Sequence, residues 1–177
     1  MDLGLKSAVV IVQGGSKGMG RAAAECFAAE SAKVGVIARN QADLDETVAA
    51  LKKLGAEDAA GFAADIGKRD QVEAAFAAIG ARWGHVNTLV NAAGAVLTGT
   101  FDQLTDEDWL DTFNVDTMGM VRCVRAALPL MRKAEWGRIV NLSAHSVKRQ
   151  SPQLVAYTAS KSAVASVTKN LSLSLAP

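Results

Sequence analysis

The chain has few of the residues that cross-link small proteins or bind metals. Its 177 residues include 2 cysteines, 2 histidines, 3 prolines and 1 tyrosine. Cys26 and Cys123 lie far apart in helical patterns, so we interpret them as small buried residues or free thiols in a reducing compartment. Because His85 and His145 are also isolated, no metal-ligand cluster is predicted.

The sequence also lacks an excess of one charge and a long apolar run. Its formal net charge is +1, and its 19 basic residues are dispersed, which argues against nucleic acid as a partner. No apolar stretch approaches the roughly 20 residues of a membrane span, and the first residues show no signal-peptide pattern. These features favour a cytoplasmic protein with no membrane partner.

What the chain does have is an alternation of short apolar runs and helical patterns. Strands are predicted over 8–12, 33–38, 60–64, 88–91 and 138–142, and helices over 18–32, 42–54, 69–83, 106–133 and 152–175. Runs that are apolar on both faces suit parallel strands covered by helices. The order predicts one α/β domain over residues 1–177, a Rossmann-like doubly wound parallel sheet with its ligand beyond the carboxyl ends of the strands.

A glycine-rich segment follows the first predicted strand and leads directly into a helix. Glycines permit a tight turn and let a pyrophosphate approach the backbone at the positive helix end. A nucleotide-triphosphate loop is excluded because Arg21-Ala22 replaces the required Lys-Ser/Thr pair. The predicted dinucleotide contacts in this segment are Gly14, Ser16, Lys17, Gly18, Met19 and Gly20.

The end of the second predicted strand indicates which dinucleotide binds. An acid there would accept hydrogen bonds from a free ribose 2′-hydroxyl and favour NAD, but Ala38 offers none. Arg39 offers a planar cation suited to a 2′-phosphate, and Lys17 can add a second charge. We therefore expect NADP(H) to be preferred over NAD(H); the alternative is that Arg39 is only a solvated loop cation.

Tyr157 and Lys161 are four residues apart in the last predicted helix. That spacing turns about 40° and rises about 6 Å, so both side chains leave one face. Because a nearby cation lowers the pKa of about 10 of a free tyrosine, the pair is a candidate proton-transfer device. The alternative is an ordinary surface pair.

Together, the glycine loop, the segment 91–94, Asn114 and the Tyr157/Lys161 pair resemble the short-chain dehydrogenase/reductase family, in the same order along the chain. The resemblance implies an enzyme that transfers a hydride between NADP(H) and a small carbonyl or alcohol substrate. Tyr157 would be the general acid or base, Lys161 would bind the nicotinamide ribose and lower the tyrosine pKa, and Asn114 would hold a water in the proton relay. Further cofactor contacts implied by the family are Asp65 and Ile66 at the adenine and Asn91, Ala92 and Gly94 near the adenosine ribose. An asparagine satisfied by the helix backbone is the alternative for Asn114.

The chain departs from the family pattern in two places. Family members usually have a serine thirteen residues before the tyrosine, where this chain has Ala144. Either Ser143, Ser146 or His145 supplies that donor, or it is missing. The sequence also stops at Pro177, whereas family members usually continue to about 250 residues. A fragment, a truncated product and the ordered part of a longer chain all fit this length.

These departures leave other functions open. One is an NADP(H)-binding protein with little or no turnover, and another is a non-redox dehydratase or epimerase of related fold. Small residues along the last predicted helix, together with the family resemblance, predict a homo-oligomer, a dimer or tetramer. They are Ala159, Ala163, Ala165 and Ser166. The substrate and the direction of the reaction do not follow from the sequence.

Overall fold

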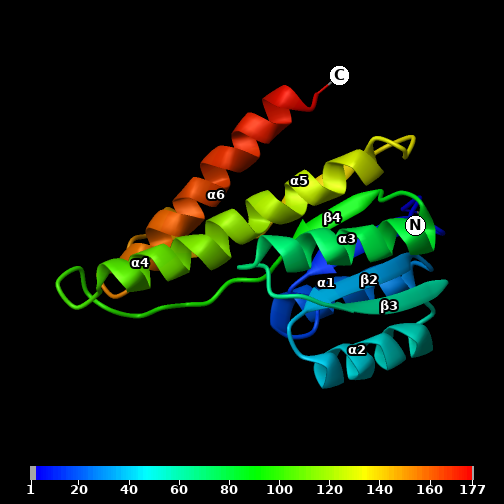
Figure 1. Cartoon of the computed structure of the whole chain (residues 1–177), viewed down its shortest axis with the longest axis horizontal. Helices are drawn as coiled ribbons and strands as arrows, with labels where there is room; N and C mark the ends of the chain where they lie inside the picture. Colours follow the sequence, from blue (N-terminus) through cyan, green and yellow to red (C-terminus); the bar gives the residue numbers. More distant parts are fainter. Residues whose placement is uncertain (1–2, 177) are drawn as a thin grey trace.

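Five parallel strands form a single sheet in the computed structural model, which describes residues 3–176 (Figure 1). The strand order is β3-β2-β1-β4-β5, and the chain reverses its winding direction between β3 and β4. The strands are β1 (Val9–Gln13), β2 (Lys33–Ala38), β3 (Asp58–Ala63), β4 (Thr88–Asn91) and β5 (Arg138–Asn141). The predicted doubly wound parallel sheet is confirmed.

Helices cover the two faces of the sheet. α1 (Gly18–Ala29) and α2 (Gln41–Lys53) pack on one face, where β1 contributes Val10 and Val12. α3 (Arg69–Trp83), α5 (Gly119–Met131) and α6 (Val155–Ser174) pack on the other, against Val9 and Ile11. Successive β1 side chains therefore feed opposite cores, which explains its continuous apolar run. No helix within residues 3–176 is long and apolar enough to cross a bilayer.

The long helix predicted over 106–133 is interrupted. α4 (Asp106–Phe113) begins with a capping box in which the Thr105 hydroxyl accepts the N–H of Asp108 at 3.2 Å. A π-helical segment, η1 (Asn114–Met118), then separates α4 from α5. A π-helical turn rotates the residues after it relative to those before, and such turns are frequent at functional sites. Here it lies beyond the carboxyl end of the sheet, below the α6 ribbon (Figure 1).

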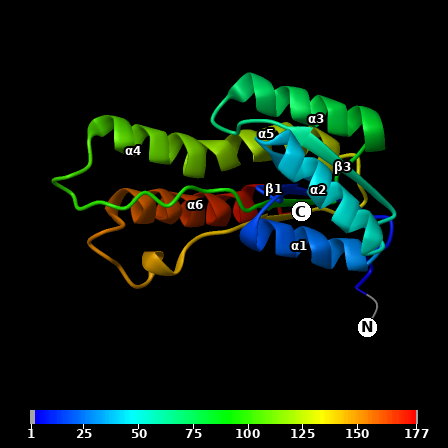
Figure 2. The same ribbon diagram turned by 90° about the horizontal axis from the view of Figure 1, so that it is seen from below.

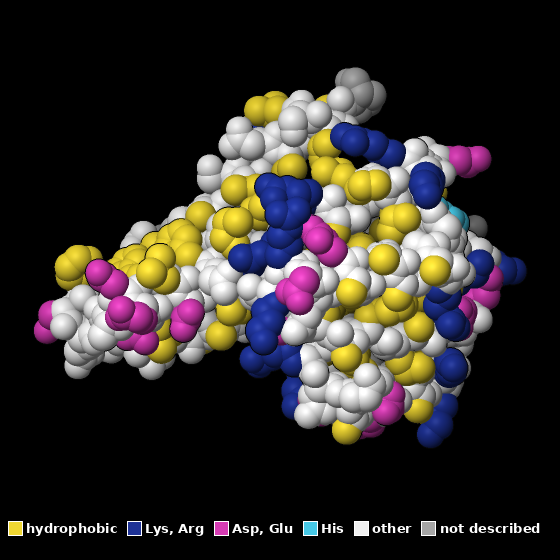
Figure 3. Space-filling view, in the orientation of Figure 1, with side chains coloured by type: hydrophobic (Ala, Val, Ile, Leu, Met, Phe, Trp, Pro, Cys, Tyr) yellow, Lys and Arg dark blue, Asp and Glu magenta, His cyan; other side chains and the backbone are white. Residues whose placement is uncertain are grey.

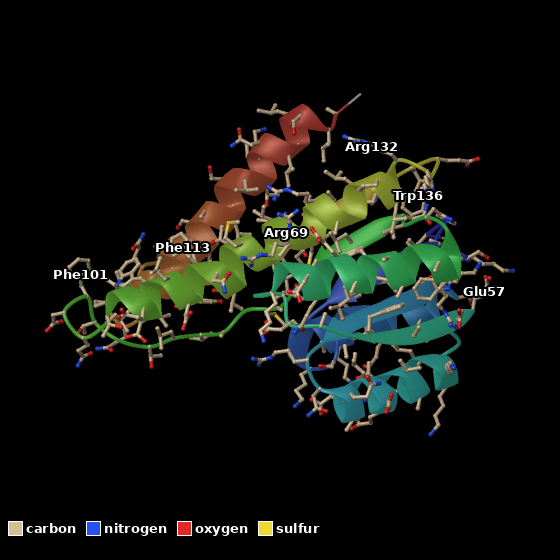
Figure 4. The ribbon with its side chains drawn as sticks, viewed as in Figure 1. Glu57, Arg69, Phe101, Phe113, Arg132 and Trp136 are labelled. Carbon is tan, nitrogen blue, oxygen red and sulfur yellow. The ribbon has the colours of Figure 1, made fainter. Side chains whose placement is uncertain are left out.

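Two loops lie at the end of the molecule where α4 and α6 begin. Figure 2 shows the loops before α4 and before α6 both reaching out to this end, and the two are joined where the N–H of Gly99 donates to the carbonyl of Gln153 at 2.9 Å. In Figure 4, Phe101 and Phe113 lie beyond the carboxyl ends of the strands, while Glu57 and Trp136 lie at the opposite end. The 3-10 turn η2 (His145–Val147) belongs to the loop between β5 and α6.

The sheet is less covered at β5 than at its centre. All five β1 residues are buried, whereas β5 has exposed residues at alternate positions and Val140 is 46% exposed. Within the described chain, β5 pairs with β4 alone. The two cysteines differ in burial. Cys123 is buried and Cys26 is exposed, so only Cys123 is a small buried residue as expected from the sequence.

Candidate active site

The loop after β1 requires glycine at two positions because the backbone on either side is so close. Gly14 has a φ of +76°, and a Cβ there would lie 2.5 Å from the backbone nitrogen of Ala93. A Cβ on Gly20 would lie 2.3 Å from the carbonyl oxygen of Gly14. The loop is thereby folded tightly against the start of α1, whose first N–H groups have no helical partner and attract anions.

A cleft of about 880 Å³ opens above this loop, along the carboxyl ends of β1 to β4. Of the residues predicted from the sequence to bind the dinucleotide, those lining it are Gly14, Ser16, Lys17, Gly18, Met19, Gly20, Arg39, Asp65, Ile66, Ala92 and Gly94. A Cβ at Gly14 or Gly20 would collide with the backbone of Ala93 or Gly14, whereas a Cβ at Gly18 would meet nothing within 4 Å. The tightly folded, glycine-rich loop therefore leaves its backbone open to a ligand that approaches it closely, as a pyrophosphate does. The residues present therefore fit a dinucleotide.

Asn91, Tyr157 and Lys161 were also predicted to contact the cofactor and are not among the residues that line the cleft. Asn91 is engaged elsewhere. Its side-chain amide donates to Oδ1 of Asn141 at 2.8 Å, and the Asn141 amide donates to the Thr168 hydroxyl at 2.9 Å. This chain of side chains links β4, β5 and α6. Asn91 is thus placed to support the sheet, and its contact with a ribose stays a prediction without geometric support.

The two cations expected near a 2′-phosphate differ in their surroundings. Lys17 Nζ lies 2.8 Å from Oδ2 of Asp43, which also lines the cleft. Arg39 is exposed and, among the interactions within residues 3–176, takes part in no ion pair. Arg39 is therefore the cation that is free to meet an anionic ligand.

Tyr157 and Lys161 leave the same face of α6, as their spacing predicts. Lys161 is only 5% exposed; its Nζ donates to the carbonyl of Leu142 at 3.3 Å and lies 5.7 Å from the centroid of the Tyr157 ring. Tyr157 is half-buried. A Cβ on Gly94 would be 2.9 Å from Lys161 Nζ, so the ammonium group borders the cleft that Gly94 lines.

A third ionisable side chain, Asp116 of η1, lies beside this pair. It is 2% exposed; its Oδ1 accepts the N–H of Ala95 at 3.1 Å and its Oδ2 lies 3.0 Å from Ser160 Oγ. A Cβ on Gly94 would be 3.0 Å from Oδ1 and 2.9 Å from Lys161 Nζ, so the carboxylate and the ammonium lie on the same side of that glycine. Asp116 was not predicted from the sequence, where its one distinguishing feature is that it is the single charged residue in the stretch 112–121.

Burial and mutual charge shift all three groups. Burial raises the pKa of the Asp116 carboxyl, and Lys161 partly opposes that rise. Burial lowers the pKa of Lys161, and Asp116 opposes that fall. The pKa of Tyr157 is raised, first by burial and then by the charge of Asp116. The expectation that the Tyr157 pKa is lowered is therefore wrong: its surroundings favour the protonated phenol.

Asn114 lies away from the pair. Its side-chain amide donates to the carbonyl of Gly67 at 3.4 Å, and its Oδ1 accepts from Arg122 Nη2 at 2.7 Å. Arg122 Nη1 also donates to the carbonyls of Ile66 and Asn114. Asn114 is thus tied to the loop after β3, and the structure places no contact between it and Tyr157.

The side chains of Ser143 and Ser146, after β5, make hydrogen bonds to groups other than Tyr157. The Ser143 hydroxyl donates to the backbone carbonyl of Lys161 at 3.0 Å, and Ser146 Oγ accepts from the Thr158 hydroxyl at 2.9 Å. His145 is exposed. None of these three side chains has a hydrogen bond to Tyr157 among the described residues, so a role for Ser143 stays a prediction.

Within residues 3–176, no group of three or more His, Cys, Asp or Glu side chains forms a site that could hold a metal ion.

A doubly wound parallel sheet with a glycine-bounded cleft at its switch point defines the class of Rossmann-type folds, and here the helix with Tyr157 and Lys161 lies beside the sheet. The sequence matches the short chain dehydrogenase family over residues 8–177, and the chain belongs to this family. It is 35% identical over 171 residues to the uncharacterized oxidoreductase YvrD of Bacillus subtilis, covering 97% of this chain and 64% of that protein.

Solved structures agree with this assignment. L-sorbose reductase from Gluconobacter frateurii, complexed with NADPH and L-sorbose, superposes with a TM-score of 0.95 at 28% identity, covering 99% of this chain and 66% of that one. A short chain dehydrogenase/reductase from Burkholderia phymatum in complex with NAD superposes with a TM-score of 0.89 at 32% identity, covering 94% and 59%. These two relatives thus bind NADPH and NAD, respectively.

Proposed function

We propose that the chain is an NADP(H)-dependent oxidoreductase that interconverts a carbonyl and an alcohol, with Tyr157 transferring the proton. The observation that carries this proposal is the position of Gly94. This residue lines the dinucleotide cleft, and a Cβ on it would lie 2.9 Å from Lys161 Nζ, so Lys161 is next to a wall of that cleft and Tyr157 is next to Lys161. A proton donor and a cofactor site are thereby brought together.

In this proposal each part of the site contacts a different part of the cofactor. The glycine loop and the start of α1 would hold the pyrophosphate, Asp65 and Ile66 would border the adenine, and Lys161 would bind the nicotinamide ribose. The bound nicotinamide supplies or accepts a hydride. As negative charge grows on the substrate oxygen, Tyr157 donates its proton to it. Burial and the charge of Asp116 raise the pKa of Tyr157, which keeps the side chain in the phenol form that can donate but makes it a weaker acid.

The decisive experiment measures NADPH oxidation against a panel of small ketones and aldehydes, for the wild type and Tyr157→Phe. We expect turnover with part of the panel, and a fall of about 10² to 10⁴ in kcat for the variant, which lacks the acid but keeps the ring. NADPH binding by fluorescence titration should stay within about twofold of the wild type. Equal turnover by both proteins would contradict the role of Tyr157.

The cofactor preference rests on Arg39. A charge-assisted contact with a 2′-phosphate contributes about 1.5 to 3 kcal/mol, so Arg39→Ser should weaken NADPH binding about tenfold or more and leave NADH binding nearly unchanged. Titration of both proteins with both cofactors measures this. A wild type that prefers NADH would refute the preference.

Ala144 favours a second candidate, a protein that binds NADP(H) with little turnover. The site has no hydroxyl at this position, and the neighbouring Ser143 hydroxyl donates to the backbone carbonyl of Lys161. Saturable NADPH binding without oxidation by any carbonyl in the panel would support this candidate over the first.

We also propose a cytoplasmic homo-oligomer, a dimer or tetramer. Hydrophobic side chains gather over α4 and the adjoining part of α6 (Figure 3), where Leu110 is 70% and Met118 40% exposed. Burial of such side chains between copies would stabilise an assembly. Light scattering tests it, and a monomer at micromolar concentration would refute it.

A further inference from the structure

Arg122 of α5 is a half-buried cation that the proposed chemistry does not use. Its Nη1 donates to the carbonyls of Ile66 at 3.1 Å and Asn114 at 3.0 Å, and its Nη2 donates to Asn114 Oδ1 at 2.7 Å. Within residues 3–176 it takes part in no ion pair, so its partners are three neutral oxygens. Because hydrogen bonds from a charged donor are stronger than neutral ones, the guanidinium group joins η1 firmly to the loop after β3.

The π-helical turn η1 explains how Arg122 reaches Asn114. Two turns of regular α-helix take about 7.2 residues, and a π-helical turn, with its i→i+5 bonds, adds about one more. Asn114 and Arg122 are eight residues apart with η1 between them, so both side chains leave the same face of the helix. That face is turned toward the loop after β3, where the Asn114 amide donates to the Gly67 carbonyl at 3.4 Å.

The loop that these bonds hold is part of the cleft wall. Asp65 and Ile66 line the cleft, and Ile66 also packs closely on α5, since a Cβ on Gly119 would lie 2.7 Å from Ile66 Cδ1. Inside the loop, the Asp65 carboxylate accepts the N–H of Gly67 at 2.9 Å. That internal bond shapes the loop, whereas the bonds from η1 and α5 fix it to the neighbouring helix.

We propose that Arg122 is a positioning residue for the adenosine half of the cofactor: it holds the loop 65–67 against η1 and thereby sets the shape of the cleft wall beside the adenine. This inference rests on the proposed function for the identity of the ligand. Arg122 is not among the residues that line the cleft, so it acts through Ile66 and Asn114 rather than by touching the dinucleotide. Its three bonds use the planar fork of a guanidinium group, which a lysine ammonium does not reproduce.

Arg122→Met tests the proposal, because it keeps an unbranched side chain of similar length and removes all three bonds. We expect NADPH to bind about tenfold more weakly, and adenosine 2′,5′-bisphosphate, which lacks the nicotinamide half, to bind more weakly by the same factor. Calorimetric titration measures both affinities. A loss for NADPH with unchanged affinity for the bisphosphate would overturn the proposal, as would no loss for either ligand.

Amide hydrogen exchange measures the loop without any ligand. We expect the N–H groups of Asp65 and Gly67 to exchange about tenfold faster in Arg122→Met than in the wild type, because the loop opens more often. Unchanged exchange would overturn the proposal. If Arg122→Met is unfolded by circular dichroism, Arg122→Lys takes its place, with an expected effect of about threefold on exchange and on both affinities, since one ammonium group cannot span the three oxygens.

Arg125→Met is the matched control, since it removes the same charge from an exposed position on the same helix. We expect its affinities and its exchange to match the wild type; losses equal to those of Arg122→Met would mean that net charge is responsible, and would overturn the proposal. Where turnover is present, Arg122→Met should raise the KM for NADPH and leave kcat within about twofold.

The outcomes for Arg122 and for the proposed function can be told apart. Proteins that bind the bisphosphate as expected but oxidise NADPH with no carbonyl would refute the proposed function and leave the role of Arg122 intact. A wild type that turns over NADPH, with equal affinities in Arg122→Met, would refute only the role of Arg122.

Discussion

The half of the molecule built on β1 to β3 and the half built on β4, β5 and α6 join where β1 pairs with β4, and they differ in how they form the candidate site. In the first half the site is formed by backbone atoms. Close contacts at Gly14 and Gly20 fold the loop against the start of α1, next to the fully buried strand β1. In the second half side chains from η1, α6 and the loop after β5 must converge, beside a strand that is partly exposed. The first arrangement is specified locally, whereas the second depends on tertiary packing.

The largest effect should come from breaking the backbone-built half with Gly14→Ala. Its Cβ would lie 2.5 Å from the Ala93 nitrogen, and its φ of +76° disfavours a side chain. The loop must shift to relieve this contact, which should weaken NADPH binding about 100-fold or more, as measured by fluorescence titration.

Gly84→Ala provides the matched control. Gly84 has nearly the same φ, +78°, but a Cβ there would meet nothing within 4 Å, and it lies at the end of α3. This variant should lose about 1 to 2 kcal/mol of unfolding free energy with unchanged NADPH affinity. Similar affinity losses in both variants would show that backbone strain, and not the close approach to Ala93, is responsible.

The second half should instead respond to Ala144→Ser. One hydrogen-bond donor at a developing oxyanion is worth about 10² to 10³ in rate, so restoring it should raise kcat at least tenfold with little change in NADPH affinity. His145→Ala should leave kcat within about twofold, because that side chain is exposed. A large fall in kcat for His145→Ala, with no gain for Ala144→Ser, would identify the histidine as the donor.

The difference between the halves also explains what the sequence could predict. The alternation of strands and helices, the glycine loop and the Tyr157/Lys161 face follow from periodicity and spacing, which are properties of short segments. Asp116 does not, because the π-helical turn that carries it interrupts the regular 3.6-residue period assumed for residues 106–133. Where the Asn114 amide and the Ser143 hydroxyl point likewise depends on Arg122 and on the Lys161 carbonyl, partners from other segments.

Asn114→Ala tests which half this residue serves. It removes the bonds to Arg122 and to the Gly67 carbonyl, so the loop after β3 should loosen and NADPH affinity should fall about three- to tenfold. Because no contact joins Asn114 to Tyr157, kcat at saturating NADPH should stay within about twofold. The control is Asn170→Ala. The Asn170 amide donates to the Ser166 carbonyl on an exposed part of α6, so its loss should change neither the NADPH affinity nor kcat. A fall in kcat with unchanged affinity would restore the proton-relay role predicted from the sequence.

The smallest effect is expected from Asp43→Asn at the far end of the cleft. The Lys17 side chain is 76% exposed, and exposed ion pairs such as Lys17–Asp43 contribute at most about 1 kcal/mol, so freeing the ammonium should strengthen NADPH binding about two- to fivefold. NADH lacks the 2′-phosphate and should gain less, and added salt should reduce the gain because the charges are solvated. Glu46→Gln controls for net charge. Glu46 lies on α2, as Asp43 does, and its removal takes an equal charge from an ion pair with Arg21. Equal gains in both variants, or an equal gain for NADH, would mean that Lys17 does not meet the 2′-phosphate and that Arg39 alone provides the preference.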